Sequence, residues 1–122
     1  MARELEIAVI DDDESFRVAL VESLQSLGYQ AVGFSSAEEY IESPQSRLFD
    51  CLVSDIHMPG VTGWDLITHM AGEGEGVPII LITGRSDRSF EAKANAAGAV
   101  SLLRKPFEIN ELVRHIETAV QE

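Results

Sequence analysis

Reactive or charged side chains follow four short apolar runs in this sequence, at the point where each run ends. The runs span residues 7–10, 51–54, 79–82 and 100–103. In chain order, the residues that follow them are Asp11 with Asp12, Asp55, Thr83, and Arg104 with Lys105. Short apolar runs separated by helical patterns are typical of buried strands in a parallel sheet. Ligands of such sheets bind beyond the carboxyl ends of the strands, so the sequence predicts a site there with three carboxylates, a hydroxyl and an ammonium.

The acidic residues after the first run are suited to a divalent cation. Adjacent carboxylates repel each other unless a cation neutralises them. Oxygen ligands of this kind suit Mg²⁺, which prefers one or two carboxylates together with waters and a phosphate. We therefore predict that Asp11 and Asp12 bind a metal ion. Asp13 and Glu14 are expected only to cap and charge the start of the helix that follows.

Asp55 follows the third predicted strand, which is usually central in sheets of this type. An isolated buried carboxylate is unfavourable, so we expect it to have a charged neighbour, which Lys105 can supply. Beside Mg²⁺, Asp55 can act as a nucleophile toward a phosphoryl group. Lys105 and the hydroxyl of Thr83 can then bind phosphoryl oxygens. The four strand ends together predict phosphoryl transfer, in which a protein mainly positions groups and balances charge.

Five strand patterns alternate with five helical patterns, without an internal repeat. The predicted strands are 5–10, 29–34, 49–54, 78–82 and 99–103. The predicted helices are 14–27, a short one that opens at Ser36 and is limited by Pro44, 63–70, 86–97 and 107–120. The glycine-rich stretch 72–76 is expected to be a surface linker, because its glutamates would repel a phosphate. We predict an α/β fold: one domain with a doubly wound, five-stranded parallel sheet and right-handed crossovers.

A few residues indicate where the helices face the core and where they begin or end. In the first helix, apolar residues recur at helical spacing and predict the buried face: Phe16, Leu20, Leu24 and Leu27. Gly28 follows at the place where a helix C-terminus favours a left-handed residue, and Gly98 ends the fourth helix in the same way. Ser36 is expected to cap the second helix, whose first turn is acidic.

Composition narrows the class of protein further. The chain has 122 residues, with 21 acidic and 9 basic side chains and a net charge of −12. A domain this acidic should repel a nucleic-acid backbone, so we expect no direct nucleic-acid binding. No apolar stretch approaches the roughly 18 residues that span a bilayer, and no signal peptide opens the chain. With its single cysteine, Cys51, inside an apolar run, the sequence predicts a cytoplasmic protein that does not bind membranes.

The chain resembles the receiver domains of two-component response regulators over essentially its whole length, 1–122. The residues that support this are Val9-Ile10-Asp11-Asp12, Ser54-Asp55-Ile56-His57-Met58-Pro59-Gly60, Ile82-Thr83-Gly84, Gly98-Ala99 and Lys105-Pro106-Phe107. All five motifs occur in order in a chain of the right size. The resemblance implies the flavodoxin-like (βα)5 receiver fold, with a cis peptide bond between Lys105 and Pro106.

The resemblance also implies a set of roles at the strand ends. Asp55 would accept a phosphoryl group from a phosphohistidine on a histidine kinase or phosphotransfer protein. Asp12, Asp55 and the backbone carbonyl of His57 would ligate Mg²⁺, with Asp11 helping through water, and the His57 side chain is expected to face solvent. Thr83 and Lys105 would bind the phosphoryl oxygens. Such a protein is a signalling switch rather than an enzyme, since it catalyses only its own phosphotransfer and slow self-dephosphorylation.

Other residues bear on how phosphorylation would be passed to an effector. The segments 55–60 and 82–84 resemble receivers that precede helix-turn-helix transcription regulators. Either a DNA-binding effector domain is expected after Glu122 in a longer regulator, or the chain is a stand-alone receiver. Receivers usually switch with Thr83 and an aromatic residue on strand five, but here that position is Leu102. We expect weaker coupling, or coupling through the helix 86–97. Our hypothesis is that phosphorylation changes the face formed by this helix, strand five and the last helix, which is also a possible homodimer contact.

Three alternatives follow from the residues. A flavodoxin-like flavin binder is the poorest of them, because acids follow the first strand where a phosphate loop should be. Asp11 and Asp13 have the spacing of the nucleophile and general acid in phosphatases of the haloacid-dehalogenase type. That reading leaves little room for a substrate cap and gives Asp55 no role. The fold could also serve as an interaction module without phosphorylation, although the complete set of strand-end residues argues against it. Trp64 is expected to pack against the fold rather than to contact a partner.

Overall fold

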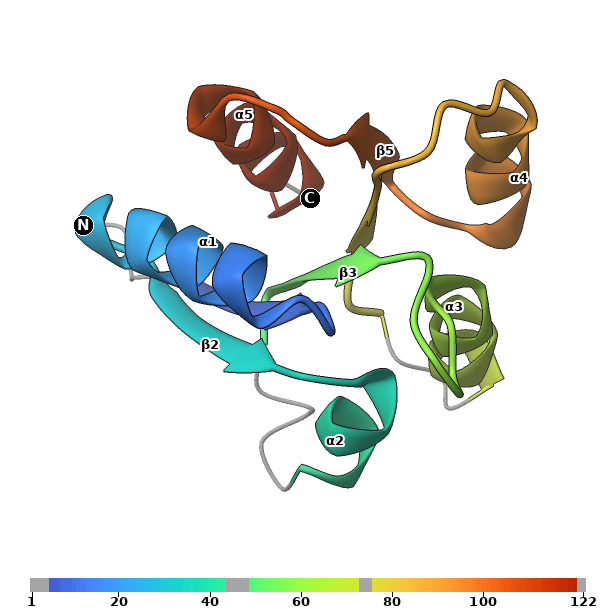
Figure 1. The fold of residues 1–122 in the computed structure, drawn as a ribbon, viewed down its shortest axis with the longest axis horizontal. Helices are drawn as coiled ribbons and strands as arrows, with labels where there is room; N and C mark the ends of the chain where they lie inside the picture. The colour runs from blue at the N-terminus through green and yellow to red at the C-terminus, as the bar shows by residue number, and fades with distance from the viewer. Residues whose placement is uncertain (1–4, 44–48, 73–75, 121–122) are drawn as a thin grey trace.

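The computed structural model describes residues 5–43, 49–72 and 76–120. Within these residues, five strands alternate with five helices (Figure 1). The strands are β1 (Glu6–Ile10), β2 (Gln30–Phe34), β3 (Cys51–Asp55), β4 (Ile79–Thr83) and β5 (Ser101–Arg104). The helices are α1 (Glu14–Ser26), α2 (Ala37–Glu42), α3 (Gly63–Gly72), α4 (Ser89–Ala97) and α5 (Ile109–Val120). Pro44 and positions 73–75 of the predicted linker lie outside the described residues.

The strands form one parallel sheet in the order β2-β1-β3-β4-β5. The chain first runs outward from β1 to β2, then returns past β1 and continues from β3 to β5. The direction of winding therefore reverses between β1 and β3, which is the place where doubly wound sheets bind ligands. The predicted doubly wound sheet is confirmed, and β3 is its central strand.

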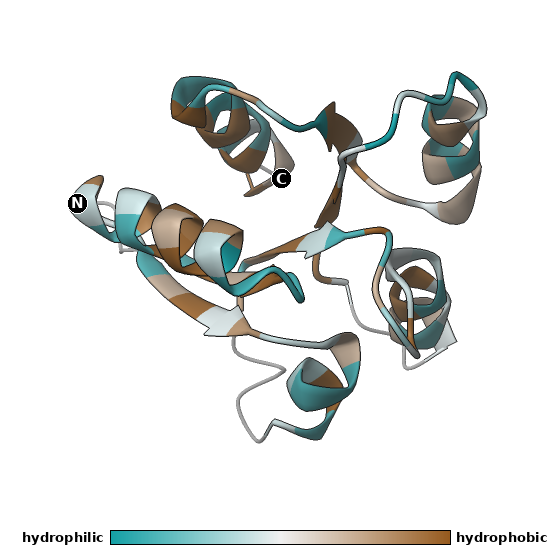
Figure 2. Ribbon diagram, in the orientation of Figure 1, coloured by the Kyte–Doolittle hydropathy of each residue, from teal (hydrophilic) through white to brown (hydrophobic). Residues whose placement is uncertain are grey.

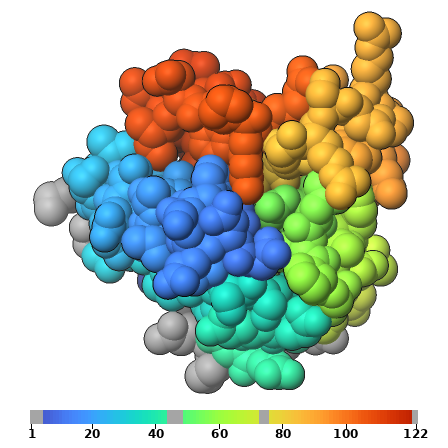
Figure 3. All heavy atoms as spheres, in the orientation of Figure 1, coloured from blue at the N-terminus to red at the C-terminus, as the bar shows by residue number. Residues whose placement is uncertain are grey.

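Helices cover both faces of this sheet, as Figure 1 shows: α1 and α5 on one face, and α2, α3 and α4 on the other. Alternate residues of a strand point to opposite faces. Ile7 and Val9 accordingly pack with α1 and α5, whereas Ala8 and Ile10 pack with α2, α3 and α4. Figure 2 shows that the strands are mainly hydrophobic (brown), whereas the helices that flank them carry both hydrophobic and hydrophilic (teal) residues. In Figure 3 the side chains of α1 and α5 abut on the face turned to the viewer.

The predicted helix caps are present. Asp13 Oδ1 accepts the N–H of Phe16 at 3.2 Å, and Ser36 Oγ accepts the N–H of Glu39 at 3.0 Å. Gly28 and Gly98 follow α1 and α4 with φ angles of 98° and 102°, the left-handed conformation that glycine adopts without a steric penalty. The Asp13 cap fixes where α1 begins, directly after the acidic residues of the predicted site.

Other boundaries differ from the prediction. The helix α4 begins at Ser89 instead of residue 86, because Asp87 Oδ1 accepts both the N–H and the O–H of Ser89, at 2.9 and 2.7 Å, and holds a turn before it. The prediction that Leu27 is buried was wrong: it is the C-cap of α1 and is 51% exposed. The cis peptide bond between Lys105 and Pro106 is confirmed, and α5 begins at Ile109. In the described part of the chain, no helix is long and apolar enough to cross a membrane.

Candidate functional site

Three carboxylates meet at the carboxyl end of the sheet. Asp11, directly after β1, is fully buried, Asp12 is exposed, and Asp55, the last residue of β3, is 7% exposed. One oxygen of each lies within 4.8 Å of the others. The strands β1 and β3 are neighbours with Ile10 opposite Ser54, so the residues that follow them converge. The structure therefore brings together the carboxylates that the sequence placed at two separate strand ends.

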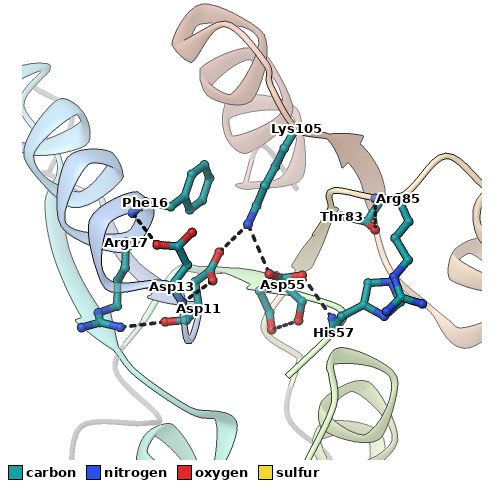
Figure 4. Close-up of polar contacts among 10 residues, drawn as sticks. Asp11, Asp13, Phe16, Arg17, Asp55, His57, Thr83, Arg85 and Lys105 are labelled. Carbon is teal, nitrogen blue, oxygen red and sulfur yellow. Dashed lines mark hydrogen bonds and ion pairs between the residues drawn. The ribbon is translucent and has the colours of Figure 1, made fainter. Parts of the chain in front are cut away.

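Lys105 reaches this acidic cluster from β5, the far edge of the sheet (Figure 4). Its Nζ lies 2.9 Å from Asp11 Oδ2 and 3.2 Å from Asp55 Oδ2. Its backbone N–H donates to the carbonyl of Thr83 at 2.8 Å, which ties the start of this turn to the end of β4. The expectation that Asp55 has a charged neighbour is confirmed.

The cluster contains more carboxylates than positively charged groups. Burial raises the pKa of Asp11, an effect larger than the opposing hydrogen bonds from the Asp13 N–H and from Lys105. Burial alone would lower the pKa of Lys105, but its hydrogen bonds and charge contacts with Asp11 and Asp55 outweigh this and raise it. One ammonium thus serves two buried carboxylates. Oxygen donors with excess negative charge are the chemistry that Mg²⁺ requires, so the cluster is a candidate metal site.

The backbone around Asp55 is packed closely against α3. Asp55 Oδ1 accepts the N–H of His57 at 3.1 Å, and the carbonyl of Asp55 accepts the hydroxyl of Ser54 at 3.0 Å. A Cβ on Gly63, the first residue of α3, would lie only 2.7 Å from the Asp55 carbonyl oxygen and 2.9 Å from Ile56 Cα. Glycine at this position therefore lets α3 begin beside the end of β3 and leaves the Asp55 side chain on the rim.

Thr83 is the last residue of β4 and is fully buried. Its Oγ1 accepts the N–H of Arg85 at 3.0 Å. Because Asp55 lies opposite Ile82 in the β3–β4 register, Thr83 is one residue beyond the strand partner of Asp55. Figure 4 shows Thr83 on the opposite side of Asp55 from Asp11.

The prediction that the His57 side chain faces solvent was wrong. Its ring packs against Phe90 of α4, with 5.5 Å between the ring centroids. Nε2 is buried and has no hydrogen-bond partner among the residues that the structure describes. Burial, followed by the nearby charge of Arg85, lowers the pKa of His57. The residue two positions after Asp55 is therefore a neutral ring wedged against α4, a role that sequence spacing did not indicate.

An aromatic column continues from His57 along the side of α4. Phe90 meets Trp64 of α3 edge to face, at 5.9 Å between centroids, and Lys93 Nζ lies 4.6 Å from the centroid of the Trp64 ring. Trp64 is also packed against the core on this face of the sheet. The expectation that Trp64 is a packing residue is confirmed. The column links the loop after Asp55 to both α3 and α4.

Leu102, the residue at the usual aromatic position, is half-buried in β5 and packs against the α4 side of the core. It lines an open hollow of about 290 Å³ whose other walls include Ala94, Ser101 and His115. Ser101 Oγ is buried, with no hydrogen-bond partner in the described part of the chain. The hollow lies between α4 and α5, on the face that is expected to change on phosphorylation.

Two residues near the site were not anticipated. The Phe16 ring lies 4.0 Å from Lys105 Nζ, although its spacing indicated only a core residue of α1. Glu38 Oε2 accepts the N–H of Val61 at 3.2 Å and so ties α2 to the loop after β3, while Glu38 Oε1 is buried without a partner among the described residues. Gly60, in the same loop, has a φ of 77°, and a Cβ at this position would press on the Glu38 carboxylate.

Comparison with known families decides the class of protein. A model of the response regulator receiver domain matches residues 7–117. The chain belongs to this family. The match includes both acidic strand ends, Thr83 and Lys105, and it gives no support to the phosphatase alternative. That alternative needs Asp13 as a general acid, whereas the Asp13 side chain caps α1.

Individual relatives agree with this assignment. The transcriptional regulatory protein FixJ of Bradyrhizobium diazoefficiens is 36% identical over 116 residues, which are 95% of this chain and 57% of FixJ. The DNA-binding transcriptional regulator NtrC of Escherichia coli K12 is 36% identical over 112 residues, 92% of this chain and 24% of NtrC. A crystal structure of FixJ-N, 30% identical, superimposes with a TM-score of 0.89 over 99% of this chain and 97% of FixJ-N. The chain spans about half the length of the first curated relatives it matches.

Proposed function

We propose that Asp55 accepts a phosphoryl group from a phosphohistidine on a histidine kinase or phosphotransfer protein. The observation that supports this most directly is the contact of Lys105 Nζ with both Asp55 and Asp11 at the end of the central strand. Asp55 keeps 7% of its surface exposed, so a donor can reach a carboxylate that is otherwise held in place. The protein would then act as a phosphorylation-dependent switch rather than as an enzyme with a released product.

The transfer itself is a simple displacement. A carboxylate oxygen of Asp55 forms a bond to phosphorus while the bond from phosphorus to the donor imidazole nitrogen breaks, and the electron pair stays on the imidazole. Lys105 and the hydroxyl of Thr83 donate hydrogen bonds to the oxygens of the transferred group. The raised pKa of Lys105 keeps the ammonium charged throughout the physiological pH range. The chain thus contributes position and charge, which dominate phosphoryl transfer.

A magnesium ion would be held by Asp12, Asp55 and the backbone carbonyl of His57, with Asp11 helping through water. When bound, it neutralises the negative charge that builds up between the carboxylate and the phosphoryl oxygens. The spacing of the three carboxylates and the burial of Asp11 favour a cation at this position. Glu38 supports the set indirectly, because its bond to Val61 fixes the loop that includes His57.

The output would be a change on the face formed by α4, β5 and α5, with Thr83 and Leu102 as the switch residues. The contacts from Asp55 to the His57 N–H, and from the His57 ring to Phe90, lead directly to α4. The same face is our candidate for a homodimer contact. We expect a receiver domain spanning 1–122, in the cytoplasm, that makes no direct contact with nucleic acid or membrane. Because the relatives FixJ and NtrC are transcriptional regulators, it would control transcription through an effector domain, in the same polypeptide or in a partner.

The test is incubation with acetyl phosphate and Mg²⁺, followed by intact-mass measurement. The wild-type protein should gain one phosphoryl group, and Trp64 fluorescence should change when beryllofluoride is added. Asp55→Asn should not be labelled. Asp65→Asn is a matched control, because Asp65 is an exposed acid near the start of α3, where its side chain accepts the N–H of Thr62 and its own N–H donates to Thr62 Oγ1. Labelling that persists in Asp55→Asn, or disappears in Asp65→Asn, would contradict the assignment.

A further inference from the structure

The Phe16 ring lies beside the ammonium of Lys105, with 4.0 Å between Nζ and the ring centroid (Figure 4). The same Nζ contacts Asp11 Oδ2 and Asp55 Oδ2. In Figure 4 the ring comes from α1 and the two carboxylates lie beyond the end of the lysine side chain. The ammonium is therefore enclosed by two anions and one aromatic ring.

Phe16 is held in place through both its backbone and its ring. The backbone N–H of Phe16 donates to Asp13 Oδ1, the N-cap of α1. The ring meets Phe107 edge to face, with 6.0 Å between centroids and 83° between planes. Phe107 is the second residue after Lys105, so this ring contact joins α1 to the turn that presents the ammonium.

A ring in this position acts on the lysine in two ways. The face of an aromatic ring carries negative potential and attracts a cation within about 6 Å of its centroid. A lysine side chain is also long and flexible, and a wall of ring atoms removes both water and alternative rotamers from one side of the ammonium. A leucine at this position would still exclude water and rotamers on that side, but it would not attract the ammonium.

We propose that Phe16 is a positioning residue, whose ring face holds the Lys105 ammonium where it binds the phosphoryl group on Asp55. This rests on the proposed function, in which Lys105 donates to a phosphoryl oxygen. Phe16 does not touch the reacting atoms; it acts through Lys105. A role of this kind predicts that the electron density of the ring, and not only its volume, sets the affinity for a phosphoryl group.

The experiment replaces Phe16 by 4-fluoro-, 3,5-difluoro- and 3,4,5-trifluorophenylalanine, using site-specific incorporation. Added fluorines weaken the negative face of the ring while its shape is nearly kept. Calorimetry measures the affinity for beryllofluoride in the presence of Mg²⁺, and thermal melting confirms that each variant is folded. The affinity should fall stepwise, by about three- to tenfold for the trifluoro ring. The same series at Phe49, in the core on the other face of the sheet, should leave the affinity unchanged.

The outcomes separate the inference from the function on which it rests. A flat series at Phe16, with a wild-type protein that binds beryllofluoride and is labelled on Asp55, overturns the inference alone. A trend of equal size at Phe49, or one that persists in the Lys105→Met background, also overturns it, because the effect would then not pass through the ammonium. If the wild-type protein binds no beryllofluoride, the proposed function fails, and this inference fails with it.

Discussion

Replacing Lys105 by methionine should destabilise the protein strongly in the absence of metal and weakly in its presence. Lys105 Nζ contacts Asp11, whose side chain is fully buried, and Asp55, whose side chain is 10% exposed. Removing one partner of a buried ion pair costs about 3–5 kcal/mol, because the remaining charge stays buried without compensation. A fifth of the Lys105 side chain is exposed, so we expect the low end of that range, about 3 kcal/mol.

Mg²⁺ should recover most of this loss. In the wild-type protein the ammonium and the metal ion compete for the same carboxylates, whereas in Lys105→Met the metal ion is the only counter-charge. Binding at 100 times the dissociation constant adds about 2.7 kcal/mol to the free energy of unfolding. The increment produced by saturating Mg²⁺ should therefore be larger in the variant than in the wild-type protein. Urea denaturation at pH 7, with chelator and with Mg²⁺, measures both increments.

The neighbouring residue provides a matched control. Arg104 is exposed and donates to the Ser86 hydroxyl at 2.6 Å, away from the acidic cluster. Arg104→Met should change the free energy of unfolding by no more than about 0.5 kcal/mol and should leave the Mg²⁺ increment as it is. A loss below about 1 kcal/mol in Lys105→Met would refute the reasoning, since the cost of an uncompensated buried charge would then be absent. Equal Mg²⁺ increments in both proteins would refute the competition.

Three further predictions concern packing and ionisation. Gly63→Ala should cost about 2–3 kcal/mol in urea denaturation, because its Cβ would press on backbone atoms, while Gly72→Ala, with open space around it, should not destabilise; equal effects would contradict this. Burial raises the pKa of the Cys51 thiol to about 12, so an aromatic disulfide reagent at pH 8 should label it in urea but only slowly in the native protein. Burial also raises the pKa of Asp11, so without metal the wild-type protein should lose stability relative to Asp11→Asn as the pH rises from about 4 to 7; a constant difference in unfolding free energy would exclude this.

Much of the fold was predictable because each local pattern agreed with the global one. Strand patterns of five or six residues that alternate with helical patterns predict a parallel sheet with right-handed crossovers. Both helix caps at Asp13 and Ser36 follow from local hydrogen-bonding chemistry. The start of α4 was missed because Ser86, Asp87 and Ser89 can all cap a helix, and only the formed turn selects among them.

The candidate site also has a part that the sequence predicted and a part that it did not. Residues at strand ends were predictable, because parallel strands bring their carboxyl ends to one rim whatever the loops do. The contacts of side chains from distant segments were not predictable. Phe16 contacts Lys105, His57 contacts Phe90 and Glu38 contacts Val61 only after packing of the helices against the sheet. Their residue types are compatible with an ordinary core or surface position, so no local signal distinguished them.

The contacts of His57 bear on how a receiver with a leucine at position 102 could transmit a signal. A leucine has no hydroxyl to bond in a second position, and it has less area to bury than an aromatic ring. The contacts of His57 can connect Asp55 to α4 without any change at Leu102. The His57 N–H is bonded to the carboxylate that would be phosphorylated, and its ring is in contact with α4.

Phosphorylation would draw the Asp55 oxygens into new contacts and alter the bond that holds the His57 backbone. Because His57 is half-buried and its buried Nε2 lacks a partner among the described residues, a small shift of the loop changes an unfavourable environment as well as a packing contact. Phe90 would transfer that shift to α4 and to Trp64. An aromatic column beside the phosphoacceptor can thus provide the coupling that an aromatic residue on β5 provides elsewhere, which is why Leu102 need not make the domain a weak switch.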